Sequence, residues 1–262
     1  MRIIVCVKQV PDAKTVRFDR EKGTIIRDGM DAVINPFDLH AIEAALQLRE
    51  HTGGTVTVIS MGPPQADSAL REAIAMGADA GVLLSDRAFA GADTLATTYT
   101  LYKAIEKLGG CDVVFCGKQA VDGDTAQVGP GLAVRLGIPS ITCVNAIELV
   151  EGHRFRVTRM CEEGREVVEV EAPVLFTVLT TLNTPRLPSL RGKMMAKKTK
   201  IPVWGAGDIS ADPGRIGFAG SPTKVVSTHV PTFNARREIL TGTPDEQVDA
   251  LIVHLKEAGI LS

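Results

Sequence analysis

Short apolar runs alternate with longer helical stretches along the first half of the chain, and this alternation limits the fold more than any other feature. The apolar runs are rich in Val, Ile and Leu, as expected of strands buried on both faces. They are residues 3–7, 55–60, 81–84 and 112–116. The helical stretches follow them at residues 37–50, 65–76, 93–108 and 124–136. This order predicts a doubly wound α/β fold with a mostly parallel sheet and right-handed crossovers.

Beyond residue 140 the pattern changes to strands that follow one another closely. Residues 141–150, 155–159 and 167–179 are strand-like, and Glu-Gly pairs mark the turns between them. We expect them to add antiparallel strands to one edge of the sheet. A Gly- and Pro-rich stretch and a Thr/Pro linker then lead to a last helix at residues 245–258. The chain is thus predicted to form an α/β domain over residues 1–222, followed over residues 223–262 by an extended C-terminal arm that reaches a partner.

Composition excludes several classes of function. The net charge of −2 provides no basic field for nucleic acid. The five cysteines form no Cys-x-x-Cys pair, which argues against a disulfide scaffold or structural zinc and favours a reducing compartment. No apolar run approaches the ~20 residues that span a bilayer, and residues 3–7 are too short for a signal-peptide core. We therefore expect a cytoplasmic protein with no membrane span, no metal site and no nucleic-acid ligand.

The loop after the fourth strand carries the strongest ligand signal. In a doubly wound sheet, ligands bind outside the carboxyl ends of the strands. Asp124 or Thr125 is placed to cap the next helix, and Gln127 lies at capping-box spacing from Asp124. The free amides of a helix start attract phosphate, while Gly123 allows close approach and Asp122 suits a ribose hydroxyl. A well-capped helix without a ligand explains the spacing equally well.

The loop after the third strand repeats part of this pattern. Residues 91–94 supply Gly and then Asp-Thr at a helix start, as residues 123–125 do. Two helix N-termini at one sheet edge suit a diphosphate or two separate nucleotides. The chain contains neither G-x-G-x-x-G nor G-x-x-x-x-G-K-[ST], which disfavours a nicotinamide-type Rossmann site and a P-loop.

No catalytic residue can be assigned from the sequence. The five histidines are scattered, and neither H-E-x-x-H nor G-x-S-x-G occurs. No side chain stands out as a nucleophile or a general base. We interpret the histidines as surface or structural residues.

Residues 186–200 combine basic side chains with Leu and Met. Flexible Leu and Met contacts suit a docking loop for protein partners. A solvated charged loop is the simpler interpretation. RNA binding is disfavoured because the stretch has no aromatic side chain on which a base could stack.

Six short motifs occur in the order and at the spacing of one known family. They are Val7-Lys8-Gln9-Val10-Pro11-Asp12, Asn35-Pro36-Phe37-Asp38, Ala75-Met76-Gly77-Ala78-Asp79, Gly117-Lys118-Gln119-Ala120-Val121-Asp122, Arg186-Leu187-Pro188-Ser189-Leu190 and Met195-Ala196-Lys197-Lys198. Over nearly its whole length the chain resembles the electron-transfer flavoprotein beta subunit. The resemblance implies an adenine nucleotide alpha hydrolase-like fold. It also implies a heterodimer with a larger alpha subunit that holds a redox FAD, and a C-terminal arm whose helix packs on that subunit.

The resemblance further implies a nucleotide in this subunit, either structural AMP or a second FAD in electron-bifurcating members. The contacts carried over from the family fall on Cys6, Asn35, Pro36, Phe37, Asp38, Met61, Gly117, Lys118, Gln119, Ala120, Val121, Asp122, Gly123, Asp124, Thr125, Ala126, Gln127 and Val128. The bifurcating type adds Asp93, Thr94 and Thr97. With only eight Phe, two Tyr and one Trp, the chain offers a flavin few rings, which fits a site that another subunit completes.

Residues 122–126 bear on which nucleotide is bound. The resemblance implies Asp-Asp-Asp followed by Ser or Cys and Asn in AMP-binding members, whereas this chain has Asp-Gly-Asp-Thr-Ala. The glycine removes a carboxylate where phosphates approach. We therefore favour FAD over AMP, with NADH as hydride donor and ferredoxin or flavodoxin as one acceptor. A non-bifurcating carrier with structural AMP is the second hypothesis. A stand-alone nucleotide-sensing module is the third hypothesis.

The resemblance also assigns residues 184–200 as the partner recognition loop. Leu190 corresponds to the leucine that anchors acyl-CoA dehydrogenase-type partners. The neighbouring residues expected to contact such a partner are Arg191, Lys193, Met194, Lys197 and Lys198.

Overall fold

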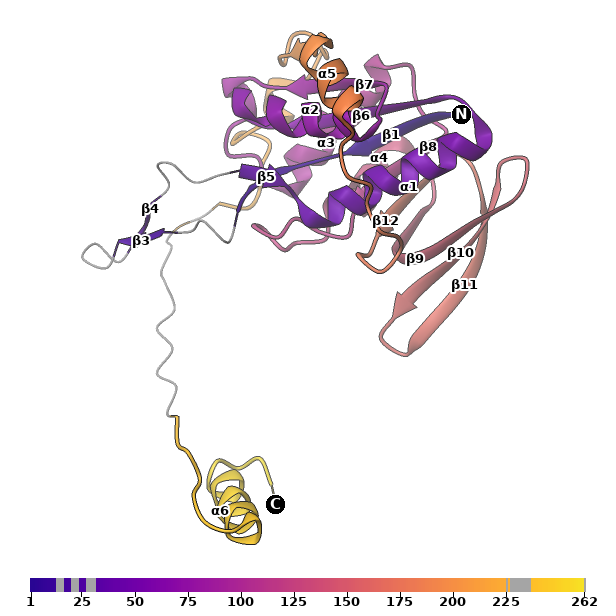
Figure 1. Cartoon of the computed structure of the whole chain (residues 1–262). Coiled ribbons are helices and arrows are strands. Elements are labelled where there is room, and N and C mark those ends of the chain that lie inside the picture. Colours follow the sequence, from indigo (N-terminus) through magenta and orange to yellow (C-terminus); the bar gives the residue numbers. More distant parts are fainter. Residues whose placement is uncertain (13–16, 20–23, 27–31, 225, 227–236, 262) are drawn as a thin grey trace. The chain divides into compact units, whose positions relative to one another are not determined.

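The structure is a computed structural model that describes residues 1–12, 17–19, 24–26, 32–224, 226 and 237–261 (Figure 1). The chain divides into two compact units, Met1–Val226 and Ser227–Ser262. The first is an α/β domain, and the second contains helix α6 (Pro244–Glu257). No helix in the described ranges is long and apolar enough to cross a membrane.

The first unit is built on a nine-stranded sheet. Its parallel strands are β1 (Arg2–Cys6), β6 (Thr55–Met61), β7 (Ala80–Leu84), β8 (Val113–Gly117), β12 (Val174–Val178) and the short β13 (Val203–Trp204). The others are β9 (Ser140–Glu151), β10 (Arg154–Cys161) and β11 (Gly164–Glu171). The order across the sheet is β11-β10-β9-β12-β8-β1-β6-β7-β13. The predicted doubly wound, mostly parallel fold is confirmed.

Helices cover both faces of the sheet because its central strands are apolar on both sides. The helices are α1 (Pro36–Thr52), α2 (Asp67–Met76), α3 (Thr94–Lys107) and α4 (Val128–Leu136). Along β1, Ile3 and Val5 pack into one core with α1 and α2, and Ile4 and Cys6 pack into a second core with α3 and α4. This period of two is the alternation of a strand buried on both faces.

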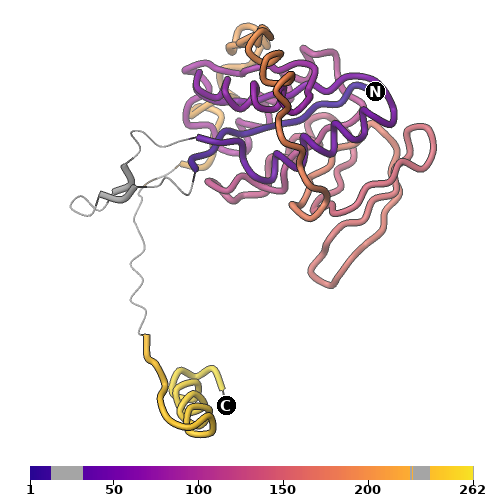
Figure 2. The backbone as a smooth tube through the Cα atoms, viewed as in Figure 1, coloured from indigo at the N-terminus to yellow at the C-terminus, as the bar shows by residue number. Residues whose placement is uncertain are grey.

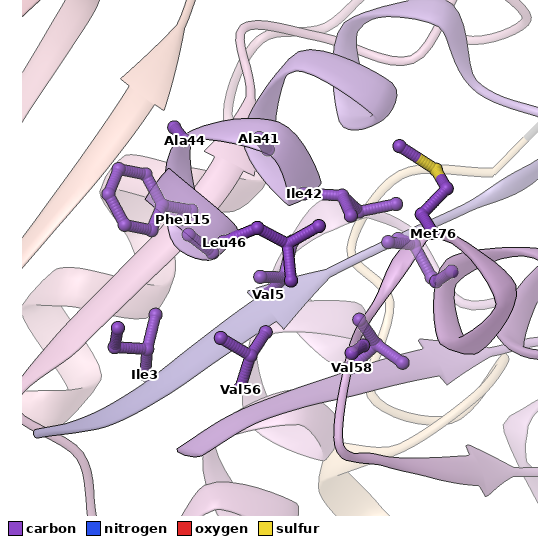
Figure 3. Packing of buried hydrophobic residues seen from close by; sticks show 14 of the residues in the cluster. Ile3, Val5, Ala41, Ile42, Ala44, Leu46, Val56, Val58, Met76 and Phe115 are labelled. Carbon is purple, nitrogen blue, oxygen red and sulfur yellow. The ribbon is translucent and has the colours of Figure 1, made fainter. Parts of the chain in front are cut away.

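Figure 3 shows the core between the sheet and α1. Val5 and Val56 lie on adjacent strands and face the helix, whose Ala41 and Leu46 are fully buried. The small alanine side chains of α1 let its backbone approach the sheet closely, so that branched strand residues fill the space between them. This packing holds the start of α1 against the ends of β1 and β8.

The antiparallel edge differs from the prediction in one respect. Residues 167–179, expected as one strand, form most of β11 and all of β12. Pro173 interrupts the ladder because it has no amide hydrogen, and the chain there crosses from the outer edge back to β8. As a result β9 pairs antiparallel with β10 but parallel with β12. Figure 2 shows the three edge strands in pink and salmon.

Two small antiparallel sheets were not expected from the sequence. β2 (Gln9–Pro11) pairs with β5 (Ala32–Ile34), and β3 (Arg17–Asp19) pairs with β4 (Thr24–Ile26). The first pair connects the end of β1 to the start of α1. It therefore brings Asn35 back beside Lys8, where the Asn35 amide donates to the Lys8 carbonyl at 2.9 Å.

The predicted recognition loop is partly helical, which corrects its assignment as a loop. Residues Leu190–Lys198 form α5, and Ser189 caps it by accepting a hydrogen bond from the Gly192 amide at 2.9 Å. The helix packs on α2 and buries Ala196. Its weak apolar periodicity hides it in the sequence, because most of its residues face solvent.

Candidate functional site

The direction of the chain across the sheet reverses between β1 and β8. From β1 the chain passes through α1 to β6 and through α2 to β7, and α3 then carries it back to β8 on the other side of β1. The loops that leave β1 and β8 therefore turn apart at their carboxyl ends. In doubly wound sheets this is the point where ligands bind.

Asn35 holds the two loops of this site together. Its side chain is fully buried, and its Nδ2 donates to the Gln119 carbonyl at 2.8 Å while its Oδ1 accepts from the Val121 amide at 3.1 Å. All of these polar groups have hydrogen-bond partners within the protein. Asn35 therefore fixes the backbone of residues 119–121. The structure thus gives this predicted contact residue a positioning role.

Asp38 has the same role for the strand ends. Its Oδ2 accepts from the Lys8 amide at 2.8 Å, and its Oδ1 accepts from the Gly117 amide at 3.1 Å and from Asn35 Nδ2 at 3.0 Å. Burial raises the pKa of the Asp38 carboxyl from 3.8 to about 7, although these three donors favour the charged form. A carboxyl at the start of α1 therefore ties β1 to β8.

The Lys8 side chain extends from the end of β1 to the loop that follows β8. Its Nζ donates to both carboxylate oxygens of Asp122, at 2.7 and 2.8 Å. Both side chains remain partly exposed, at 48% and 33%, so the pair adds little to stability. The ion pair instead fixes the position of Asp122 beside the end of β1.

The start of α4 corrects the predicted capping box. The helix begins at Val128, four residues later than expected, and neither Asp124 nor Thr125 caps it. Asp124 and Ala126 have φ values of 53°, which turn the backbone away from a helical path. The Asp124 carboxylate instead accepts from the Gln119 side chain. Gln127 occupies the N-cap position and forms no side-chain cap, so the first-turn amides of α4 have no acceptor among the described side chains.

The start of α3 matches the prediction. Asp93 caps this helix by accepting from the amides of Leu95 and Ala96 at 2.9 and 3.1 Å. Thr94 donates from its hydroxyl to Gln127 Oε1 at 2.9 Å. The two helix starts therefore meet at one edge of the sheet, one capped and the other open. The predicted similarity between residues 91–94 and 123–125 is confirmed for their position near helix starts at one sheet edge. It is wrong for capping, because only Asp93 caps its helix.

Three further predicted contact residues lie at the ends of β1, β6 and β8. Cys6 is the register partner of Cys116, and their hydrogen bond, together with burial, raises the pKa of the Cys6 thiol. The thiol therefore stays neutral within the core on the α3 and α4 side. Met61 ends β6 and packs against the core on the α3 and α4 side. At Gly117 an added Cβ would lie 2.6 Å from Phe37 Cβ, so this close approach requires glycine.

The predicted partner-binding residues form a separate surface on α5. Leu190 is 78% exposed and Met194 is 57% exposed, and the four basic residues between 191 and 198 are exposed as well. Arg71 on α2 anchors the helix by donating to the Ala196 carbonyl at 2.6 Å. Arg186, just before α5, pairs with the buried Glu43 at 2.8 Å and with Glu50 at 2.6 Å, so it is a structural anchor.

Lys8 is the residue of this site that the sequence analysis did not select as a contact. It is the second residue beyond β1, and the rule that ligands bind outside the strand ends was enough to select it. The pairing with Asp122 carries no local signal, because 114 positions separate the two residues. Within the described ranges, no group of three or more His, Cys, Asp or Glu side chains could hold a metal ion.

Comparison with known proteins agrees with this arrangement. The Electron transfer flavoprotein domain family matches residues 22–209. An electron transfer flavoprotein subunit beta from Thermoanaerobacterium thermosaccharolyticum is 50% identical over the full length of both chains. The chain belongs to the electron transfer flavoprotein beta-subunit family. This confirms the resemblance carried by the six motifs, and it assigns the chain to flavin-dependent electron transfer.

Two other relatives extend the family's range. The caffeyl-CoA reductase-Etf complex subunit CarD of Acetobacterium woodii is 46% identical over the full length of both chains. Protein FixA of Azorhizobium caulinodans is 43% identical over 97% of this chain and 94% of its own length. A beta subunit implies an alpha-subunit partner.

Proposed function

We propose that this chain is the beta subunit of a cytoplasmic heterodimer that carries electrons between an acyl-CoA dehydrogenase-type flavoenzyme and other redox carriers. We further propose that it binds FAD at the loops that leave β1 and β8. The observation that carries the cofactor proposal is the open start of α4, which lies beside Thr94 at the start of α3. Unpaired amides at a helix start are suited to the phosphates of a nucleotide.

The residues of these loops and of the first turn of α4 fit a dinucleotide. The amides of Val128 and Gly129 point out of the first turn of α4, and Lys8 supplies a cation beside the end of β1. An added Cβ on Gly123 would meet no heavy atom within 4 Å, so the packing of this chain does not itself require a glycine there. The lack of a side chain leaves room for a ligand to approach the backbone.

The chain contributes position and charge to the reaction. When bound, FAD would accept a hydride or single electrons. Asn35 and Asp38 fix the loop and strand ends, while Lys8 and the first turn of α4 would hold phosphates. Asp93 sets the start of α3 beside them, so that Thr94 and Thr97 are placed to contact the rest of the cofactor. No acid or base residue is assigned.

Three observations support FAD and electron bifurcation over structural AMP. Gly123 replaces a carboxylate side chain with open space, α3 brings a second helix start to the site, and the chain has few aromatic rings of its own. A site completed by the alpha subunit suits a flavin. NADH would then reduce this FAD, and the two electrons would leave separately, one through the alpha-subunit FAD and one to ferredoxin or flavodoxin.

The proposed docking element for the dehydrogenase is α5. Leu190 and Met194 present apolar surface, and Arg191, Lys193, Lys197 and Lys198 surround it with positive charge. The name of the relative CarD places that protein in a complex with a caffeyl-CoA reductase, which supports a partner enzyme that acts on acyl-CoA thioesters.

The bound nucleotide tests this proposal. The chain would be produced together with its alpha subunit, the heterodimer denatured, and the released nucleotides identified and counted by mass spectrometry. Two FAD per heterodimer are expected. AMP with a single FAD would instead establish a non-bifurcating carrier, and a stable monomer that does not associate with an alpha subunit would contradict the heterodimer itself.

A further inference from the structure

A hollow of about 620 Å³ lies between α3, α4 and the turn at residues 213–215. It is lined by Leu95, Thr98, Val134, Arg135 and Arg215 together with three glycines. None of these residues belongs to the nucleotide site described above. We call it the α3–α4 hollow.

The helix on one side of the hollow has an apolar outer face. The sequence of α4 contains a single charged residue, Arg135. Val134 on this helix is 81% exposed, and Leu95 on α3 is 50% exposed. The outer face of a surface helix normally carries charged and polar side chains, so this composition is typical of a helix that a partner covers.

Two arginines that line the hollow have no counter-ion among the described residues. The guanidinium carbons of Arg215 and Arg135 lie 4.2 and 5.4 Å from the centroid of the Tyr99 ring, which brings two like charges close together. Arg135 is held in place because it donates to Thr98 Oγ1 and to the Leu95 carbonyl, both at 3.0 Å. Within the described part of the chain, neither arginine forms an ion pair with a carboxylate.

The charge balance of the hollow therefore calls for an anionic partner. Burial and the nearby charge of Arg215 lower the pKa of Arg135, as expected when two cations share one site. The partner must also offer apolar surface for Val134 and Leu95. An open hollow of this kind does not enclose a small molecule, whereas arginine and aromatic residues beside apolar side chains are typical of protein interfaces.

We propose that the α3–α4 hollow receives an apolar side chain flanked by carboxylates from the alpha subunit. Its place in the fold supports this occupant, because α4 begins at the nucleotide site. A chain that covers α4 also reaches the mouth of that site and could complete it. The inference rests on the proposed function, because it takes the alpha subunit as the partner.

Two substitutions test whether this surface contacts the alpha subunit in the heterodimer. One adds a negative charge at Val134, and the other reverses the charge of Arg215. Val134→Glu and Arg215→Glu change exposed side chains, so the variants are expected to fold with an unchanged circular dichroism spectrum. Each should raise the dissociation constant of the heterodimer at least about tenfold. Arg165→Glu is the matched control, since Arg165 is exposed near the start of β11 and forms no ion pair in the described ranges. It should leave the dissociation constant unchanged.

A photo-crosslinking residue at position 134 identifies the occupant directly. In the heterodimer it should crosslink to an alpha-subunit peptide with Asp or Glu close to the attachment point. A crosslink only to the dehydrogenase would overturn the proposal in favour of a redox-partner surface. A rise in thermal midpoint with inorganic phosphate, lost in Arg215→Glu, together with unchanged assembly would overturn it in favour of an anion site.

The two proposals fail in different ways. If the unmodified chain does not assemble with an alpha subunit, the proposed function fails. If it assembles, and the Val134→Glu and Arg215→Glu variants assemble equally well, only the inference about the hollow is wrong.

Discussion

Asp38 is the residue whose environment has the most direct measurable consequence. It is buried at the proposed nucleotide site, and three N–H donors hold its carboxylate. Burial nevertheless dominates and raises its pKa to about 7. A group that joins β1, α1 and β8 therefore changes its protonation state near neutral pH.

This predicts a pH dependence of stability. The unfolded chain releases the Asp38 proton near pH 3.8 and the native protein near pH 7, so the native state binds more protons between these values. The free energy of unfolding should therefore fall as pH rises from about 4 to about 7, by at most about 4 kcal/mol from this group, and should then level off. Urea unfolding of the wild type and of Asp38→Asn measures it. The variant should lose this component of the slope, and identical slopes would contradict the prediction.

Gly117 and Gly123 form a matched pair for separating packing from ligand binding. An alanine Cβ at position 117 would meet Phe37 at 2.6 Å and would also press on the Asp38 carboxylate, whereas at position 123 it would meet nothing within 4 Å. Gly117→Ala should lower the free energy of unfolding by about 1–3 kcal/mol. Gly123→Ala should change it by less than about 0.5 kcal/mol but reduce the nucleotide content of the heterodimer. Full nucleotide content in Gly123→Ala would contradict close approach at this residue.

The prediction that Asp124 caps α4 is wrong because of its backbone angles. Its spacing from Gln127 fits a capping box, but capping also requires a backbone that enters the helix at the next residue. The positive φ of Asp124 and Ala126 delays the helix to Val128. Spacing alone contains no information about these angles.

At the scale of elements, α5 shows how a helix can depend on its neighbours. Its first turn is capped by Ser189, but its exposed residues provide little apolar periodicity. Contact with α2 stabilises it, through the buried Ala196 and the hydrogen bond from Arg71. A helix held in this way presents Leu190 at a fixed position on the surface.

Leu190→Ala should therefore weaken electron transfer to the dehydrogenase while leaving the flavin content unchanged. The loss should appear as a lower rate at limiting partner concentration, about tenfold if Leu190 fills a pocket on the partner. Leu187→Ala is the control, because Leu187 is also exposed, at 88%, but precedes the helix. Equal rates for the wild type and Leu190→Ala would remove α5 as the docking element.

Helix α6 carries exposed apolar side chains. Val248, Leu251 and Ile252 lie at helical spacing and are 54%, 47% and 39% exposed. A capping box formed by Thr243 and Glu246 defines its start. An amphipathic helix with an exposed apolar stripe is suited to packing on another chain, and we propose the alpha subunit for this role.

At the scale of the whole molecule, the two units differ in how they are stabilised. Both hydrophobic cores lie in the first unit, between Ile3 and Ile216. Among the described residues, none from the second unit belongs to either core. The first unit ends at Val226.

A chain shortened to Met1–Val226 should therefore fold. Its thermal midpoint should lie within about 4 °C of that of the full chain, because no core residue is removed. Its affinity for the alpha subunit should fall by at least about tenfold, because the stripe on α6 is lost. Leu251→Asp in the full chain tests that stripe separately. Unchanged affinity in both variants would contradict the proposed role of α6.

The alternating pattern of the first half determined the α/β class, because β-branched runs and helical periodicity are local properties of the sequence. The motifs likewise determined the family and the position of the candidate site. Only the tertiary structure decided how Asn35 and Asp38 tie the strand ends together, where α4 begins and that residues 190–198 are helical. The start of α4 depends on the positive φ of Asp124 and Ala126, and the other two depend on hydrogen bonds or packing between segments distant in the chain. Such contacts form only when the sheet order brings the segments together.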